Sequence, residues 1–232
     1  MAFEILYEIL LVIIGYLFGS IPVAYLIGKI WYGIDIREHG SGNMGTANVL
    51  RVLGKKAGLI TLAFDMLKGA LALLCVRFYL WFGNYRGFET IRSETVFLEE
   101  GFLLALVAFM TILGHSYPVW LKFKGGKSAA VGAGALLGVN PIAFAIVMVV
   151  WFPLLKFTKL MSLSNLIVAW FSPPLYWFFA GTKWFDNRSW WAFGLSFIMI
   201  AFVYWRHRAN IKRLIAGEER KMGEKADIKE QE

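Results

Sequence analysis

Long apolar runs dominate this chain and restrict it to one class of fold. Five of them lie at Ile5–Gly28, Ala57–Phe82, Phe102–Leu121, Met161–Ala180 and Trp190–Trp205. A helix needs about 20 apolar residues to cross a bilayer. Runs of this kind, in a chain that is 58% hydrophobic, are typical of membrane proteins and not of soluble domains. The sequence therefore predicts an all-α integral membrane protein.

A sixth apolar stretch, Ser128–Leu155, carries no charge but is interrupted by Asn140-Pro141. Because proline ends or kinks a helix, the stretch is either one tilted helix or a hairpin of two short ones. With a hairpin, and thus seven spans, the cytoplasmic segments hold about four times as many Lys and Arg as the outer ones, and with six spans this excess disappears. We therefore expect a seven-transmembrane-helix bundle with the N-terminus out and the C-terminus in. Neither half of the hairpin is long enough to cross a core of about 30 Å, so we expect both to pack inside the bundle.

The rest of the chain indicates one membrane domain over residues 1–232. The first run carries only Glu8 as a charge and exceeds the ~7–15 residues of a signal-peptide core, so we expect a retained span. Residues 206–232 form a basic tail on the cytoplasmic side, and its last residues are expected to be disordered. The basic residues lie between spans, so membrane topology explains the net charge of +8 better than nucleic-acid binding does.

The first polar segment between spans, Gly40–Arg51, has an unusual composition. It holds three glycines, Gly40, Gly42 and Gly45, and the polar side chains of Ser41, Asn43, Thr46, Asn48 and Arg51. Glycines let backbone amides approach an anion closely, and a guanidinium can bind a phosphate through two hydrogen bonds. The segment therefore predicts a phosphate site. The alternative is a glycine-rich turn whose arginine only sets the topology.

The second polar segment, Gly114–Ser128, repeats this pattern. It contains His115 and the run Lys124-Gly125-Gly126-Lys127, which directly precedes an apolar stretch. Two cations on a flexible backbone at the start of a helix favour an anion. The alternative is that the lysines extend to the membrane surface and obey the positive-inside rule. Both polar segments and the tail should lie on the cytoplasmic face, which makes an enzyme acting on phosphate at the membrane surface the favoured interpretation.

Two pairs of polar residues have a spacing of three, which places each pair on one face of a helix. Asp65 and Lys68 lie inside the second run, where charges are costly, so they form either a structural ion pair or part of the substrate site. His207 and Asn210 lie in the basic tail, for which an amphipathic helix on anionic lipid is the alternative interpretation.

Several familiar signatures fail here. Gly40–Gly45 satisfies G-x-G-x-x-G, but membrane helices flank it, whereas the dinucleotide fingerprint needs a βαβ unit. The three histidines show no spacing for metal ligands, and the single cysteine, Cys75, excludes a disulfide framework. The His-x4-Asp motif of acyltransferases that use acyl-CoA is absent. We expect no metal and no cofactor.

Four segments of the chain and its tail carry a family resemblance. They read GYLFGSIPVAYLIGK (Gly15–Lys29), DIREHGSGNMGTANVLRVLG (Asp35–Gly54), FDMLKG (Phe64–Gly69), GHSYPVWLKFKGGKSAA (Gly114–Ala130) and HRANIKRLIAGEE (His207–Glu219). In this order they resemble the bacterial membrane acyl-phosphate:glycerol-3-phosphate acyltransferase family, which makes lysophosphatidic acid. The chain departs from the family's usual GATN at Gly45-Thr46-Ala47-Asn48, and it has Ser128 where glycine is common.

The resemblance implies an acyltransferase of the inner membrane with its site at the cytoplasmic face. Its substrates would be acyl phosphate and glycerol 3-phosphate, and it would act as a monomer in contact with membrane lipid. The implied catalytic residues are Ser41, Arg51, Lys127, His207 and Asn210. The expected phosphate- and substrate-binding residues are Gly40, Gly42, Asn43, Gly45, Asn48, Lys124, Gly125, Gly126, His115, Asp65 and Lys68. The alternative function is a membrane transporter or binding protein for a phosphorylated metabolite.

Overall fold

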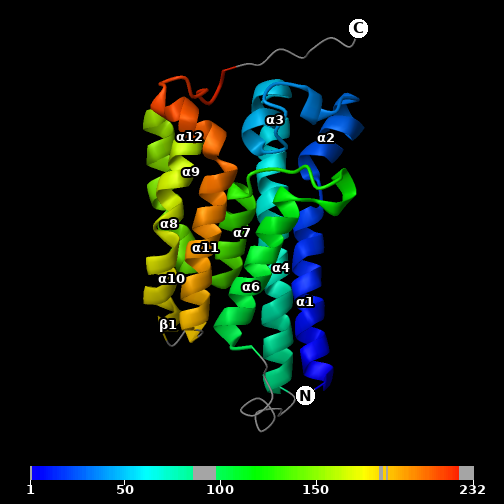
Figure 1. Cartoon of the computed structure of the whole chain (residues 1–232), viewed down its shortest axis with the longest axis vertical. Helices are drawn as coiled ribbons and strands as arrows, with labels where there is room; N and C mark the ends of the chain where they lie inside the picture. The colour runs from blue at the N-terminus through cyan, green and yellow to red at the C-terminus, as the bar shows by residue number, and fades with distance from the viewer. Residues whose placement is uncertain (1, 86–97, 183–184, 187, 225–232) are drawn as a thin grey trace.

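A computed structural model describes residues 2–85, 98–182, 185–186 and 188–224, and Figure 1 shows them as a bundle of helices. The helices are α1 (Ala2–Ser20), α2 (Val23–Tyr32), α3 (Thr46–Val52), α4 (Lys55–Tyr85), α6 (Glu100–Ser116), α7 (Ala129–Val139), α8 (Pro141–Thr158), α9 (Met161–Ala169), α10 (Ser172–Ala180), α11 (Trp190–Arg206) and α12 (Arg208–Ile215). Two 3-10 turns, η1 (Ile36–Glu38) and η2 (Val119–Leu121), and the antiparallel strands β1 (Gly181–Thr182) and β2 (Phe185–Asp186) lie in the connections.

Four helical segments are long and apolar enough to cross a bilayer: Ile5–Tyr32, Lys55–Phe82, Glu100–Leu121 and Pro141–Thr158. The helices α7 and α11 are apolar but shorter. Large apolar side chains such as Phe78, Val149 and Phe178 are exposed on the outside of the bundle, where a soluble protein would place polar groups. The predicted all-α architecture with several spans is confirmed, whereas the number of seven and the orientation of the termini stay predictions.

Proline interrupts two of the predicted spans. The first run ends as α1 at Ser20 and resumes as α2 after Pro22, because proline has no N–H to donate and disfavours the helical conformation of the residue before it. The run Met161–Ala180 is divided into α9 and α10 just before Pro173 and Pro174, which occupy the first turn of α10. Both interruptions leave their halves packed within the bundle.

The stretch Ser128–Leu155 is a hairpin, as one of the two alternatives predicted. Asn140 separates α7 from α8, and its side-chain oxygen accepts a hydrogen bond of 2.9 Å from the Ala143 N–H. The prediction that neither half is long enough to cross a membrane is correct for the 11 residues of α7 and wrong for α8, whose 18 residues reach Thr158. α8 extends beyond the expected end, and Lys156 lies in its last turn.

Glycines bring α7 and α6 close to their neighbours. A side chain at Gly134 of α7 would overlap the Met66 carbonyl of α4, and one at Gly114 of α6 would overlap the Tyr16 carbonyl of α1. Small residues of this kind let membrane helices pack backbone to backbone. The short helix α7 is therefore held against α4 inside the bundle, with its N-terminus at the end that carries the polar segments.

Polar elements gather at one end of the bundle. Figure 1 places α2, α3 and α12 at this end, while the start of α1 and the strand β1 lie at the other. The predicted convergence of both polar segments and the tail is therefore confirmed. The tail is ordered through Glu224, and the Met222 N–H donates to the Lys159 carbonyl over 2.7 Å. The expected disorder of the last residues falls on 225–232, outside the described residues.

Candidate functional site

An elongated cavity of about 580 Å³ runs through the bundle from this polar end. Side chains from α3, α4 and every helix from α6 to α12 line it. The polar end is formed by Ser41, Asn43, Arg51, Lys127, His207, Asn210, Arg213, Glu219 and Arg220. The remaining walls are mostly apolar and come from α7, α8 and α11. The cavity therefore joins a cationic mouth to an apolar interior.

The first polar segment is shaped by a buried amide. Asn48 is 1% exposed, its Nδ2 donates to the carbonyls of Ile36 and His39 over 3.2 and 3.1 Å, and its Oδ1 accepts from the Ser41 N–H over 2.8 Å. Gly40 has φ of +61°, and a side chain there would overlap the Asn48 amide. Asn48 and Gly40 therefore hold the loop that presents Ser41 to the cavity.

Arg51 is the cation that the helix after this loop, α3, places in the cavity. It lies in the last turn of α3 and lines the mouth. Its Nε is buried and makes no hydrogen bond within the described part of the chain, and the same holds for the hydroxyl of Thr46. Burial, and then the nearby charge of Arg220, lowers the pKa of Arg51. A half-buried guanidinium with an unused donor is suited to an anionic ligand.

The glycines of the second segment permit a tight turn over α6. The Gly126 N–H donates to the His115 carbonyl over 3.0 Å, and Arg206 donates to the carbonyls of Gly125 and Gly126 over 3.1 and 2.7 Å. A side chain at Gly126 would overlap the imidazole of His115. This turn directs Lys127 into the cavity, whereas Lys124 is exposed and lies outside the cavity lining.

Asp65, Lys68 and His115 form a buried polar cluster beside the mouth. The Lys68 Nζ lies 2.8 Å from an Asp65 carboxylate oxygen and 2.9 Å from His115 Nδ1, and it donates to the Ile21 carbonyl over 2.7 Å. The ion pair expected as one alternative is therefore present, and it ties the break between α1 and α2 to α4 and α6. Asp65 and His115 also line the cavity, and Lys68 does not.

The C-terminal segment closes over the mouth through a carboxylate. Glu219 accepts hydrogen bonds from Ser162 Oγ over 2.9 Å, from Asn210 Nδ2 over 2.6 Å and from Arg213 Nε over 2.8 Å. The Lys127 ammonium donates to Asn210 Oδ1. Although burial raises the pKa of Glu219, these hydrogen bonds outweigh it and hold the pKa below its usual range. Glu219 thus fixes the orientation of the Asn210 amide.

The electrostatics of the mouth differ between its lysine and its histidine. Burial, and then the nearby charge of Arg213, lowers the pKa of Lys127 to about 8. Burial lowers the pKa of His207 to about 4. A neutral His207 whose Nδ1–H donates to the Val203 carbonyl, 2.8 Å away, leaves Nε2 as a hydrogen-bond acceptor. The mouth therefore offers cationic donors together with the neutral acceptor of His207.

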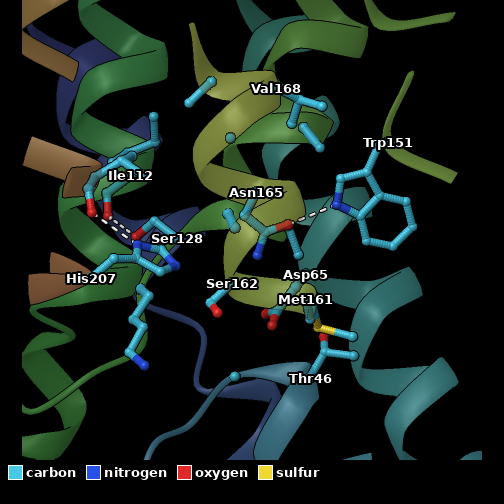
Figure 2. Close-up of a pocket in the computed structure, with 18 of the residues that line it drawn as sticks. Thr46, Asp65, Ile112, Ser128, Trp151, Met161, Ser162, Asn165, Val168 and His207 are labelled. Atoms are coloured by element: carbon cyan, nitrogen blue, oxygen red, sulfur yellow. Dashed lines mark hydrogen bonds between the residues drawn. The ribbon is translucent and has the colours of Figure 1, made fainter. Parts of the chain in front are cut away.

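Figure 2 shows His207 and Ser128 on one wall of the cavity and Trp151 with Asn165 on another. Ser128 Oγ donates to the Ile112 carbonyl, and Trp151 Nε1 donates to Asn165 Oδ1 over 2.8 Å. Sequence analysis did not identify five polar residues of the cavity lining. They are Ser162 and Asn165 of α9, Arg213 of α12, and Glu219 and Arg220 after α12. Ser162 and Asn165 stand three apart in an apolar run, which is the signal that would have revealed them.

The predicted residues divide into two groups by position. Those that line the cavity are Ser41, Asn43, Gly45, Asn48, Arg51, Asp65, His115, Lys127, His207 and Asn210. Those outside the lining are Gly40, Gly42, Lys68, Lys124, Gly125 and Gly126. Four of the second group are glycines whose backbones shape the two loops. Lys68 contacts two residues of the lining, Asp65 and His115.

Comparison with known proteins places most of the chain within one sequence family. A family model described as glycerol-3-phosphate acyltransferase matches residues 9–217. The glycerol-3-phosphate acyltransferase of Thermosynechococcus vestitus is 43% identical over 214 residues, which cover 92% of this chain and 94% of that protein. The protein of the same name from Macrococcus caseolyticus is 36% identical over 219 residues, covering 92% and 96%.

Solved structures give the same result. The crystal structure of PlsY (YgiH), an integral membrane glycerol 3-phosphate acyltransferase, in its glycerol 3-phosphate form matches with a TM-score of 0.74 and 28% identity, covering 94% of this chain and 96% of that one. The lysophosphatidic acid form of PlsY matches with a TM-score of 0.71 and 29% identity over the same shares.

Proposed function

The chain belongs to the glycerol-3-phosphate acyltransferase family, and from that premise we propose that it takes its acyl group from acyl phosphate and transfers it to the sn-1 hydroxyl of glycerol 3-phosphate. The protein is an integral membrane acyltransferase of phospholipid synthesis. The cavity is the observation that supports both the proposed acyl donor and the proposed position of the active site. Its cationic mouth fits two phosphate groups, and its apolar interior fits a fatty acyl chain.

The cations of the mouth form two groups, which can bind the phosphate groups of two substrates. Arg51 reaches the mouth from α3 and Lys127 from the turn before α7, while Arg213 reaches it from α12 and Arg220 from the segment that follows α12. Two phosphorylated substrates need two such groups of donors. Ser41 and the N–H groups at the start of α7 add neutral donors beside them. The acyl chain extends from the mouth into the apolar walls of α7, α8 and α11.

The chemistry requires positioning and charge stabilisation. The sn-1 hydroxyl oxygen attacks the acyl carbonyl carbon, the bond between that carbon and the bridging oxygen breaks, and inorganic phosphate leaves with the bonding electrons. The hydroxyl proton passes to a phosphate oxygen. His207 Nε2 accepts the hydroxyl's hydrogen bond and so orients it, while Arg51 and Lys127 stabilise the departing phosphate. No acyl-enzyme is needed, because an acyl phosphate already has a good leaving group.

The orientation follows from the charge distribution. With the C-terminus inside, the polar end of the bundle and its mouth face the cytoplasm, where both phosphorylated substrates are soluble or membrane-associated. A transporter, the alternative function, would place its anion site near the membrane midplane between repeats. The cations here gather at one end of the bundle instead.

Product identification tests this proposal. Purified protein is given palmitoyl phosphate and glycerol 3-phosphate, with EDTA present. We expect 1-palmitoyl lysophosphatidic acid and inorganic phosphate in equal amounts, identified by mass spectrometry and phosphate assay. Uptake of labelled glycerol 3-phosphate into proteoliposomes without acylation would instead support a transporter. Loss of activity in EDTA that one metal restores would show that the reaction needs a metal.

A further inference from the structure

One face of α11 lines the cavity along most of its length. Ala192, Ser196, Met199 and Val203 lie on it, and His207 follows at the mouth. Steps of three and four residues keep these side chains on one face of a helix. Gly194, on the opposite face, is exposed, and no atom lies within 4 Å of the position where its side chain would begin. The helix therefore has one face toward the cavity and one toward lipid.

The length of this face matches a fatty acyl chain. Between Ala192 and His207 the helix rises about 22 Å at 1.5 Å per residue. An extended alkyl chain advances about 1.3 Å per carbon, given C–C bonds of about 1.5 Å. The cavity wall formed by α11 therefore spans roughly 17 carbons by this arithmetic.

Buried side chains line the far end of the cavity. Ala192 is 1% exposed, Tyr176 is 7% exposed and Ala105 is 9% exposed, and all three belong to one packed apolar cluster. Ala180, one turn beyond Tyr176 in α10, is fully buried in the same cluster and is not among the described residues that line the cavity. The cavity therefore ends near Ala192, where Ala105, Tyr176, Val139 and Phe144 are among the described residues that bound it.

We infer that α11 limits the length of the acyl chain. The size of the side chains at Ala192 and Ser196 then sets the longest acyl group that the enzyme transfers efficiently. The inference rests on the proposed function, because it places the acyl chain in this cavity. Ser196 lies one turn nearer the mouth than Ala192, a distance of about 6 Å, which corresponds to four or five carbons at the spacing given above. A large side chain at Ala192 or Ser196 should therefore shorten the preferred acyl chain. The shortening should be greater at Ser196, because it lies nearer the mouth.

The test compares Ala192→Phe and Ser196→Phe with the control Gly194→Phe. Lysophosphatidic acid formation is measured with decanoyl, myristoyl and palmitoyl phosphate for each purified protein. For Ala192→Phe, the ratio of kcat/KM for the decanoyl to the palmitoyl donor should rise roughly tenfold or more, since several methylenes lose their buried position. Ser196→Phe should also discriminate against the myristoyl donor. Gly194→Phe adds the same ring on the lipid face and should keep the wild-type ratio.

A variant with a smaller added side chain keeps the test valid if the phenylalanine variants fail to fold. Ala192→Leu should shift the ratio in the same direction by less, and Tyr176→Ala, which enlarges the far end, should improve transfer from a stearoyl donor relative to the palmitoyl donor. Variants that lose activity equally on all chain lengths, or keep the wild-type ratio, would overturn the role of α11 while leaving the proposed function intact. Failure of wild-type protein with every acyl phosphate would instead overturn the proposed function.

Discussion

Arg51 is the residue at which function and topology can be separated. Its buried Nε makes no hydrogen bond within the described residues, and its planar guanidinium offers donors that a lysine cannot place in the same way. We predict that Arg51→Lys lowers kcat/KM roughly ten- to hundredfold, because each charge-assisted hydrogen bond contributes about 1.5–3 kcal/mol. Steady-state kinetics at matched expression measure the effect.

Lys55 and Lys56 provide the controls for this substitution. Both are exposed at the start of α4, close in sequence to Arg51. If Arg51 serves only the topology, Arg51→Lys keeps the charge and should be silent, while Lys55→Ala and Lys56→Ala should matter as much as Arg51→Ala. Wild-type activity of Arg51→Lys would therefore remove Arg51 from the site.

We predict that activity falls at alkaline pH because the Lys127 ammonium loses its proton. Burial lowers its pKa to about 8, so the charged form that binds phosphate prevails below this pH and is lost above it. We expect kcat/KM to fall about tenfold per pH unit above about 8, because that parameter reports the groups of the free enzyme. Lys127→Arg retains the charge at higher pH, so its alkaline limb should move upward. A pH profile that is the same for both proteins would exclude Lys127 as the titrating group.

At the residue scale, the sequence predicted which residues line the cavity better than it predicted their contacts. Residue type and glycine spacing identified Ser41, Arg51 and Lys127, because these patterns lie within single short segments. They did not show that the Asn48 amide makes its hydrogen bonds within its own loop, or that Lys124 lies outside the cavity lining. Those outcomes depend on neighbours distant in the sequence.

The turn between η2 and α7 is the element that most directly supports the mouth. A side chain at Gly125 would overlap the His115 carbonyl, which is backbone and cannot turn aside. We predict that Gly125→Ala displaces Lys127 and lowers kcat/KM at least about tenfold, since misplacement of about 1 Å can cost a hundredfold. Kinetics with Gly194→Ala as the control test this, because Gly194 has open space around it. Equal activity of the two variants would show that the turn tolerates a side chain.

At the element scale, hydrophobic length predicted where helices exist, and local chemistry predicted some of their breaks. Asn140-Pro141 identified the hairpin of α7 and α8, since the amide caps the helix that proline begins. The divisions at Pro22 and Pro173 lie in apolar runs that read as continuous spans. The docking of the C-terminal segment could not be predicted, because Glu219 finds Ser162 across 57 residues of sequence.

At the scale of the whole molecule, orientation in the membrane is the prediction to test. With Cys75 replaced by serine, a cysteine is introduced either at Thr182, beside the bundle end with β1, or at Ala216, after α12. An impermeant maleimide added to intact cells should label Thr182→Cys and leave Ala216→Cys unlabelled until the membrane is opened. The reverse pattern would place the mouth outside the cell and contradict the charge-based orientation.

The choice of acyl donor tests the central claim most directly. One preparation of purified protein is supplied with glycerol 3-phosphate and, in separate reactions, with palmitoyl phosphate, palmitoyl-CoA or palmitoyl-acyl carrier protein, and lysophosphatidic acid is quantified. The cationic mouth leading into an apolar cavity predicts efficient transfer from palmitoyl phosphate and little or none from the other two donors. Robust transfer from palmitoyl-CoA with none from palmitoyl phosphate would contradict it.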